Sequence, residues 1–309
     1  MSSPHITIGT RGSQLALAQT DWVATSLRTA HPDAVVDVKR IVTRGDRQQK
    51  SPLPEIGGKG LFTAELETAL LEGTIDLAVH SAKDLPTTFP DGLALAVMPA
   101  REDPRDVLVS RDGRHLTDLP DGAVLGTSSL RRQAQLRMHR PDLAFTVLRG
   151  NVDTRIRKVL VDGQCDATVL AMAGLLRIGL QDHVTEVLDP DRMLPAAGQG
   201  ALALQTRAED DRVRALLAAL QHEATYRAVL CERYVIRQLQ GGCQAPIGVS
   251  AQIDGDRLAC RAVVVSLDGQ RHARAQRTGT ADEIESVGQQ VVDQLRDAGA
   301  DEILAACRR

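Results

Sequence analysis

Two segments of the chain carry side chains suited to acid–base or covalent chemistry. Asp84 follows a buried strand pattern and begins a proline turn, which would present its carboxylate to a cleft as an acid or base. Cys243 follows two glycines, whose conformational freedom suits an exposed loop tip. An accessible thiolate there is a nucleophile or an attachment point. On local grounds a surface aspartate and an inert loop cysteine remain alternatives.

Three further segments, which we call helix mouths, place arginine where a strand ends and a helix begins. Ser, Thr or Asn in each can cap the helix, whose free N–H groups favour anions, and a guanidinium adds donors matched to carboxylate or phosphate. Such loops gather at one edge of an open α/β sheet. They therefore predict a ligand with several negative groups, although capped helices and arginines are also common for purely structural reasons. The segments are Gly9–Ser13, Gly126–Arg132 and Leu148–Arg155.

Composition narrows the ligand class further. The chain has 309 residues, a net charge of −3 and only one Trp, two Tyr and three Phe, so a basic, base-stacking nucleic-acid binder is disfavoured. No P-loop motif is present, which disfavours a nucleoside triphosphate. Five irregularly spaced cysteines indicate neither a disulfide framework nor a metal site. No signal peptide or membrane-crossing stretch is visible in the sequence, so we expect a cytoplasmic protein.

Hydrophobic periodicity places these segments in a mixed fold. Short apolar runs alternate with helical patterns over the first two-thirds of the chain, as in βαβ units around a largely parallel sheet. The polar, proline-bearing segment Pro99–Asp106 and the segment Pro195–Gly200 read as crossings between two lobes. From about residue 209 two helical patterns, three strands joined near Asp254-Gly255 and Asp268-Gly269, and a last helix at about 281–298 indicate a small α+β domain.

Taken together, these segments resemble the porphobilinogen deaminase family, and the matching stretches run in family order across nearly the whole chain. They are Gly9–Gln19, Thr43–Asp46, Gly57–Phe62, Ala78–Pro86, Arg101–Asp106, Gly126–Arg132, Leu148–Arg155, Gly198–Ala201 and Gly241–Gly248.

The resemblance implies an α/β fold with two lobes like those of a periplasmic binding protein and a small C-terminal α+β domain. Domain 1 would comprise residues 1–99 and 198–217, domain 2 residues 100–197, and domain 3 residues 218–309. It also implies a transferase of porphyrin, tetrapyrrole and heme biosynthesis, working as a cytoplasmic monomer without nucleic acid or membrane. Four porphobilinogen molecules would be condensed head to tail with loss of ammonia, giving the linear tetrapyrrole hydroxymethylbilane.

The same resemblance assigns residues. Asp84 matches the catalytic aspartate, and Cys243 matches the cysteine that holds a dipyrromethane cofactor by a thioether. Residues expected to bind the cofactor are Lys83, Ser129, Arg131, Arg132 and Gln199. Residues expected to bind substrate or the growing chain are Arg11, Ser13, Lys59, Phe62, Arg149, Arg155 and Arg177. Glu55 stands where some family members have lysine, which leaves one carboxylate contact in doubt.

Two other readings remain open at this stage. A non-catalytic two-lobed module that binds an anion or solute would explain the arginines at the helix mouths. It would give no functional role to Lys83-Asp84, Cys243 or the third domain. A phosphoribosyl- or nucleotide-dependent transferase would require a phosphate motif that the sequence lacks.

Overall fold

The computed structural model describes residues 3–44, 63–240 and 245–307. Contacts divide the chain into two compact units, each formed from two segments of sequence. Unit 1 comprises residues Met1–Arg101 and Ala201–Tyr226, and unit 2 comprises Glu102–Gly200 and Arg227–Arg309. The chain therefore passes between the units at residues 101–102, 200–201 and 226–227.

Unit 1 is an α/β lobe around a five-stranded sheet with the order β2-β1-β3-β10-β4. Strands β1, β2 and β3 are parallel, whereas β10 runs antiparallel to both of its neighbours. Its elements are β1 (His5–Thr10), α1 (Gln14–Ala30), β2 (Val35–Arg40), α3 (Ala64–Leu71), β3 (Leu77–Ser81), the 3-10 turn η1 (Ala82–Asp84), β4 (Leu93–Val97), β10 (Leu202–Arg207), α7 (Asp211–Leu217) and η4 (Ala218–Leu220).

The first part of unit 2 repeats this arrangement. Its sheet has the order β7-β6-β8-β5-β9, in which β6, β7 and β8 are parallel and β5 is the antiparallel strand. Its elements are β5 (Asp106–Ser110), η2 (Leu116–Asp118), β6 (Val124–Gly126), α4 (Leu130–His139), β7 (Ala144–Thr146), α5 (Val152–Leu160), β8 (Ala167–Ala171), α6 (Met172–Arg177), η3 (Gln181–His183) and β9 (Glu186–Val187).

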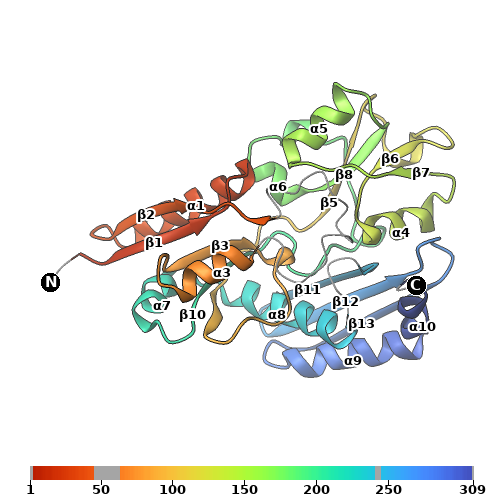
Figure 1. Ribbon diagram of the computed structural model, residues 1–309. Coiled ribbons are helices and arrows are strands. Elements are labelled where there is room, and N and C mark those ends of the chain that lie inside the picture. The colour runs from red at the N-terminus through yellow and green to blue at the C-terminus, as the bar shows by residue number, and fades with distance from the viewer. Residues whose placement is uncertain (1–2, 45–62, 241–244, 308–309) are drawn as a thin grey trace. The chain divides into compact units, whose positions relative to one another are not determined.

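The two sheets, whose strands Figure 1 labels, are related by how the chain crosses between the units. The outward crossing leads into unit 2 at residues 101–102, and the return crossing leads back into unit 1 at residues 200–201. In unit 1 the antiparallel strand β10 comes directly after the return crossing, and in unit 2 the antiparallel strand β5 comes directly after the outward crossing. In each sheet the antiparallel strand therefore begins at the edge where the parallel strands end. Both crossing segments are delivered to that edge, which is where ligands bind in open α/β sheets.

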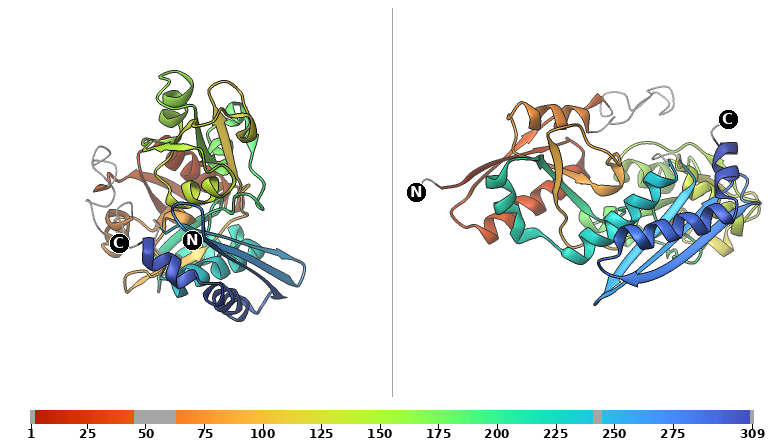
Figure 2. Two further views of the ribbon diagram at one scale, coloured as in Figure 1. Left: turned by 90° about the vertical axis from the view of Figure 1, so that its right-hand side faces the viewer. Right: turned by 90° about the horizontal axis from the view of Figure 1, so that it is seen from below.

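The rest of unit 2 is a three-stranded antiparallel sheet with helices on one face (Figure 2). Its elements are α8 (Glu223–Gln238), which begins in unit 1, β11 (Ile247–Asp254), β12 (Arg257–Val265), β13 (His272–Thr280), α9 (Ile284–Asp297) and α10 (Ala300–Cys307). Alternate residues of β12 serve two interfaces, as strand geometry dictates. Cys260, Ala262 and Val264 face the helices, while Val263 and Val265 pack against Ala134 of α4.

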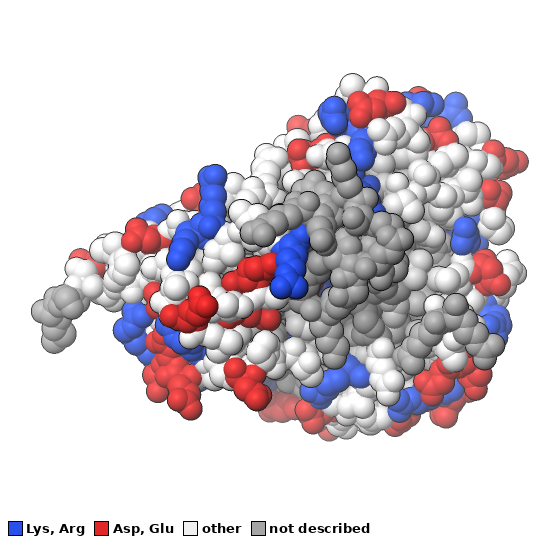
Figure 3. All heavy atoms as spheres, in the orientation of Figure 1, with Lys and Arg blue, Asp and Glu red and all other residues white. Residues whose placement is uncertain are grey.

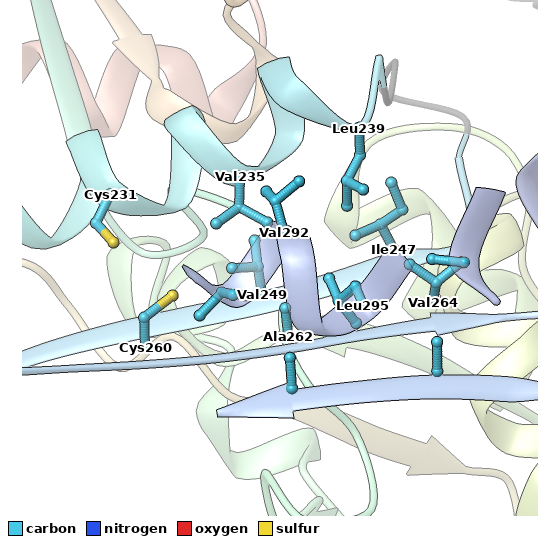
Figure 4. Close-up of a cluster of buried hydrophobic side chains, with 14 of the residues drawn as sticks. Cys231, Val235, Leu239, Ile247, Val249, Cys260, Ala262, Val264, Val292 and Leu295 are labelled. Atoms are coloured by element: carbon cyan, nitrogen blue, oxygen red, sulfur yellow. The ribbon is translucent and has the colours of Figure 1, made fainter. Parts of the chain in front are cut away.

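Figure 4 shows the helix-facing core of this sheet. Side chains of α8, β11, β12 and α9 interdigitate there, and most are fully buried. Cys231 of α8 and Cys260 of β12 turn their sulfur atoms toward one another as free thiols. The core explains why the helical and strand patterns of this region were readable in sequence, since each element has one continuous apolar face.

The expected fold class of two α/β lobes with a small C-terminal α+β domain is confirmed by these sheets. Both expected hairpins are present; the first turn lies at Gly255-Asp256, one residue later than expected. Cys165 lies in the loop before β8, where it is buried. The helix α10 was not expected at all. The proposed three-domain boundaries stay a prediction.

Candidate active site

In unit 1, Arg11 lies between β1 and α1. Ser13 is the N-cap of α1, and its side-chain oxygen accepts a hydrogen bond from the Ala16 N–H at 3.3 Å. This cap satisfies one of the free N–H groups at the start of the helix. Arg11 and Ser13 are both half-buried, so the expected anion-favouring mouth is present at the carboxyl end of β1.

Lys83 and Asp84 lie at the same edge of this sheet, in the single turn η1 that follows β3. Lys83 is half-buried and Asp84 is exposed. The turn is held from two sides: the Gln19 amide of α1 donates to Ser81 Oγ at 2.9 Å, and the Ala82 N–H donates to the Ala201 carbonyl at 3.0 Å. These bonds fix the backbone that carries Asp84 against both the first helix and the return crossing.

His80, next to this turn, is a buried and neutral histidine. Burial lowers its pKa from 6.5 to about 4, and the nearby charge of Arg11 lowers it further, while a hydrogen bond to Gln205 opposes the shift. His80 Nε2 lies 3.0 Å from Gln205 Oε1, and Gln205 Nε2 donates to Glu67 Oε1 at 3.3 Å. Because the Gln205 oxygen is an acceptor, His80 carries its proton on Nε2.

In unit 2 the mouths of α4 and α5 follow the parallel strands β6 and β7, which are neighbours in the sheet. Ser129 is the N-cap of α4 and accepts from the Arg132 N–H at 3.4 Å. The third mouth differs from expectation, because Asn151 lies at the N-cap of α5 but its side chain makes no capping bond. Both mouths nevertheless open at one edge of the sheet.

Arg149 and Arg155 belong to the mouth of α5 and are half-buried. Arg155 Nε donates to the Gly150 carbonyl at 2.8 Å, and Lys158 Nζ donates to the Arg149 carbonyl at 3.0 Å. Gly150 has φ +117°, a conformation that side-chain-bearing residues rarely adopt. The loop is therefore held by cationic side chains bonded to its own backbone.

The most heavily bonded part of the site is a cluster of Asp106, Arg131 and Arg132. Asp106 is the first residue of antiparallel β5 and pairs with Ala171, the last residue of β8, so it lies at the edge where the parallel strands end. Arg131 Nη1 and Nη2 donate to the two Asp106 oxygens at 2.5 and 3.3 Å. Arg132 Nε and Nη2 donate to Asp106 Oδ1 at 3.1 and 2.7 Å.

This cluster is almost completely buried. The side chain of Asp106 is 0% exposed, and those of Arg131 and Arg132 are 6% and 8% exposed. Burial alone would raise the pKa of Asp106, but attraction and hydrogen bonds from the two guanidiniums hold it well below its ordinary value. The cluster therefore contains two positive charges and one negative charge, a buried excess of one positive charge.

The guanidiniums also retain donors. Arg131 makes one further bond, from Nη1 to the Leu194 carbonyl at 2.7 Å, and Arg132 makes one from Nη1 to the Val169 carbonyl at 2.8 Å. Each uses three of its five N–H donors on partners among the described residues. Arg131 keeps its Nε–H and one Nη2–H, the pair along one side of the guanidinium, and Arg132 keeps one N–H on each Nη nitrogen.

Gln199 and Arg177 lie against the crossing segments. Gln199 Nε2 donates to the Pro104 carbonyl at 2.7 Å and to Asp106 Oδ1 at 3.1 Å. Arg177 Nη2 donates to the Gly200 carbonyl at 2.6 Å, and the Glu102 N–H donates to the same oxygen at 3.2 Å. Burial lowers the pKa of Arg177 to about 10, with Glu102 opposing the shift, so the side chain stays charged at neutral pH.

Gly248 of β11 lies next to this cluster. Gly248 packs so closely on Leu194 that an added Cβ would lie 2.7 Å from the Leu194 Cβ, and the Leu194 carbonyl accepts from Arg131. Glu232 of α8 accepts from the Gly198 N–H at 2.6 Å and from the Ala251 N–H at 2.8 Å. Gly248 and its neighbours thus join the C-terminal sheet to the segment that contacts the cluster.

Three expected site residues, Lys59, Phe62 and Cys243, lie outside the described residues, as does Glu55. Of the other cysteines, Cys165, Cys231 and Cys260 are buried, and burial raises the pKa of Cys165 and of Cys307. For Cys260 the hydrogen bond with Cys231 and burial both raise the thiol pKa well above its ordinary value.

Sequence reasoning did not single out Asp106, His80, Gln19 or Gln205. An acidic residue at the start of the apolar run 107–109 was the available signal for Asp106, since a carboxylate beside a buried strand requires a partner. Gln19 and His80 lay inside quoted stretches, but their partners are 62 and 125 positions away.

A carboxylate-bearing pyrrole cofactor fits this arrangement. A buried excess of positive charge is costly unless an anion neutralises it, and each guanidinium keeps two donors to meet one. The anchoring residue expected from sequence, Cys243, is five positions before Gly248, a separation that an extended chain spans in at most about 18 Å.

Comparison with known proteins agrees with this reading. Residues 6–215 match the family model described as porphobilinogen deaminase, dipyromethane cofactor binding domain, and residues 226–297 match porphobilinogen deaminase, C-terminal domain. The chain is 50% identical over 300 residues to the porphobilinogen deaminase of Roseiflexus castenholzii (97% of this chain, 98% of that protein). It is 50% identical over 304 residues to that of Desulforudis audaxviator (98% of each).

Among solved structures, the methionine-binding protein MetQ is similar with a TM-score of 0.44 and 15% identity, covering 72% of this chain and 92% of MetQ. The near-complete coverage by sequence relatives and the match of both family models decide the assignment. This chain belongs to the porphobilinogen deaminase family.

Proposed function

We propose that this chain is a hydroxymethylbilane synthase, which condenses four porphobilinogen molecules head to tail, releases ammonia at each addition and yields the linear tetrapyrrole hydroxymethylbilane. The observation that carries the proposal is the buried arginine pair, whose two positive charges share the one negative charge of Asp106 among the described residues, in a chain of this family. Each pyrrole of the substrate and product bears acetate and propionate groups, which guanidinium edges bind well.

Cys243 would hold the dipyrromethane cofactor through a thioether. Bound there, the cofactor supplies the pyrrole to which the first substrate is joined. The cofactor's carboxylates would be bound by the donors that Arg131 and Arg132 keep, together with Lys83, Ser129 and Gln199. Ser129 and Gln199 already have protein partners, so we assign them to positioning the backbone and Asp106 as well as to contact.

Binding of substrate and of the growing chain is assigned to Ser13 and to the remaining cations. Arg11, Ser13 and Arg149 lie just after the carboxyl ends of parallel strands, where helix N-termini add N–H donors. Arg177 differs from the others because its guanidinium bonds the Gly200 carbonyl, so its first task is to hold the crossing. The assigned residues are Arg11, Ser13, Arg149, Arg155 and Arg177, with Lys59 and Phe62 outside the described residues.

Asp84 is assigned to the chemistry. Loss of ammonia from porphobilinogen leaves a cationic azafulvene, which a nearby carboxylate stabilises by charge. An Asp84 carboxylate oxygen would then accept the proton released once the new carbon–carbon bond has formed. The exposed position of Asp84 in a turn held by Gln19 and the Ala201 carbonyl suits a group that must meet successive substrate rings.

Replacement of this carboxylate tests the assignment. Asp84→Asn keeps the shape of the side chain and is expected to retain the cofactor while losing at least about a hundredfold in kcat, the usual contribution of a general acid–base group. Asp91→Asn, an exposed aspartate in the same unit, is the matched control and should keep wild-type turnover. Undiminished turnover in Asp84→Asn would refute the role.

Intact mass tests the cofactor assignment. The purified wild-type chain should be heavier than its sequence by a covalent dipyrromethane, and Cys243→Ser should have the mass of the bare chain. An unmodified wild-type mass would instead favour a non-catalytic module that binds anionic solutes.

The working state is also part of the proposal. We expect a cytoplasmic monomer that requires neither nucleic acid nor membrane. In the described residues no helix combines the length and apolarity needed to cross a bilayer. On the face drawn in Figure 3, basic and acidic side chains of the described residues are interspersed, which disfavours a nucleic-acid partner. Light scattering at micromolar concentration should give the mass of one chain.

A further inference from the structure

Asp106 has no role in the proposed reaction, yet it is the acceptor at the centre of the arginine cluster. Its Oδ1 atom alone accepts from Arg131, Arg132 and the Gln199 amide. Its side chain is wholly buried, whereas the side chains of Arg131 and Arg132 are slightly exposed, at 6% and 8%. An approaching ligand can therefore reach the arginine side chains but not the carboxylate.

The geometry of these bonds determines which donors remain. Asp106 occupies the end of the Arg131 guanidinium, through Nη1 and Nη2, and leaves its Nε side. On Arg132 it occupies the Nε side of the guanidinium instead, through Nε and Nη2. The Leu194 and Val169 carbonyls then block one Nη1 donor on each arginine. Neither side chain can turn without breaking three hydrogen bonds to buried partners.

The charge balance of the cluster also indicates that Asp106 controls how the arginines bind a ligand. Without Asp106, two adjacent guanidiniums would repel one another in a buried site, and burial together with the charge of Arg131 already lowers the pKa of Arg132, with Asp106 opposing the shift. With Asp106 present the pair is tolerated, but one positive charge is left over. A single ligand carboxylate completes the balance, whereas two would leave an excess of negative charge.

We propose that Asp106 is a positioning residue for cofactor binding: it orients the Arg131 and Arg132 guanidiniums and sets the charge of their cluster so that it accepts one carboxylate of a pyrrole. The inference rests on the proposed function, because the ligand is the cofactor assigned there. It adds a residue whose own side chain does not touch that ligand.

Two substitutions separate a charge role from a packing role. Asp106→Asn keeps the shape of the side chain but removes its charge, and Asp106→Glu keeps the charge but adds a methylene to a filled site. If Asp106 acts as the counter-ion of the arginines, the Glu variant should carry more bound cofactor than the Asn variant. If Asp106 is needed only for packing, the Asn variant should carry more bound cofactor than the Glu variant.

The measurement is the fraction of purified chain that carries the covalent adduct, by intact mass, with the melting temperature recorded alongside. Wild type should be loaded, and Asp106→Asn should be loaded about tenfold less, the loss expected for one charge-assisted bidentate bond. The matched control is Asp142→Asn, which removes an equally bidentate but more exposed partner of Arg140 at the other end of α4. It should load as wild type does.

The outcomes are distinguishable. A wild-type chain without adduct contradicts the proposed function, not this inference alone. A loaded wild type with an equally loaded, folded Asp106→Asn overturns the inference and leaves the function standing. If Asp106→Asn does not accumulate as folded protein, Asp106→Glu decides the matter: a folded Glu variant without adduct overturns the counter-ion role.

Discussion

Gly200, where the chain returns from unit 2, should tolerate no side chain. Its φ of +87° is a conformation that L residues rarely adopt. A Cβ built there would lie 2.3 Å from the Glu102 carbonyl oxygen, a backbone atom that cannot rotate away. Gly200→Ala must therefore displace one of the two crossing segments from the other.

The cost can be worked from the contacts that this displacement breaks. Placing alanine at positive φ costs about 1–2 kcal/mol. The Glu102 N–H bond to the Gly200 carbonyl is worth about 1 kcal/mol and the charged Arg177 bond about 1.5–3 kcal/mol. We expect Gly200→Ala to lower the free energy of unfolding by about 3.5–6 kcal/mol, from the same contributions.

Urea denaturation followed by circular dichroism measures this change, and Gly179→Ala is the control. Gly179 has φ +68° in the same unit, but an added Cβ would meet nothing within 4 Å. The control should lose only the conformational part, about 1–2 kcal/mol. Equal losses in the two variants would show that contact with Glu102 and the bonds to the Gly200 carbonyl contribute nothing to stability.

Three further outcomes follow from buried groups. His80 stays neutral in the folded chain down to about pH 4, while its unfolded form binds a proton below 6.5, so stability is lost as pH falls through this window and is constant above it. The loss is about 3 kcal/mol, and His80→Gln should flatten it in urea titrations at successive pH values; an unchanged slope would contradict burial of the neutral ring. Cys231 and Cys260 should resist alkylation at pH 8 in the native chain and react after unfolding, read by mass; rapid native labelling would place them outside the core. Gly248→Ala should cost about 1–3 kcal/mol by driving a Cβ to 2.7 Å from Leu194, and a neutral result in thermal melts would mean that this interface yields freely.

Most elements of the fold were predictable from local sequence signals. The capped mouths at Ser13 and Ser129 were readable because a cap and its helix are adjacent in sequence. The hairpins were readable because Asp-Gly pairs favour tight turns, although the connection between β12 and β13 is longer and spans residues 266–271. The antiparallel place of β10 in the sheet of unit 1 depends on pairing with β3, which no local pattern encodes.

The site was predictable only in part, for the same reason. Arg131 and Arg132 were identified as anion-binding residues, but their partner Asp106 is 25 positions earlier and meets them only because β5 runs antiparallel between β8 and β9. Arg177 was expected to bind substrate, whereas its described bond is to a crossing carbonyl. The substrate role of Arg177, like those of Arg11, Arg149 and Arg155, stays a prediction.

Intact mass after mixing with limiting porphobilinogen shows whether successive porphobilinogen units are added to a primer anchored on Cys243. We expect a ladder of equally spaced heavier species on the wild-type chain, each step one pyrrole unit, and none on Cys243→Ser. A wild-type mass that does not change with substrate, or a ladder that persists in Cys243→Ser, would contradict addition to a primer on Cys243.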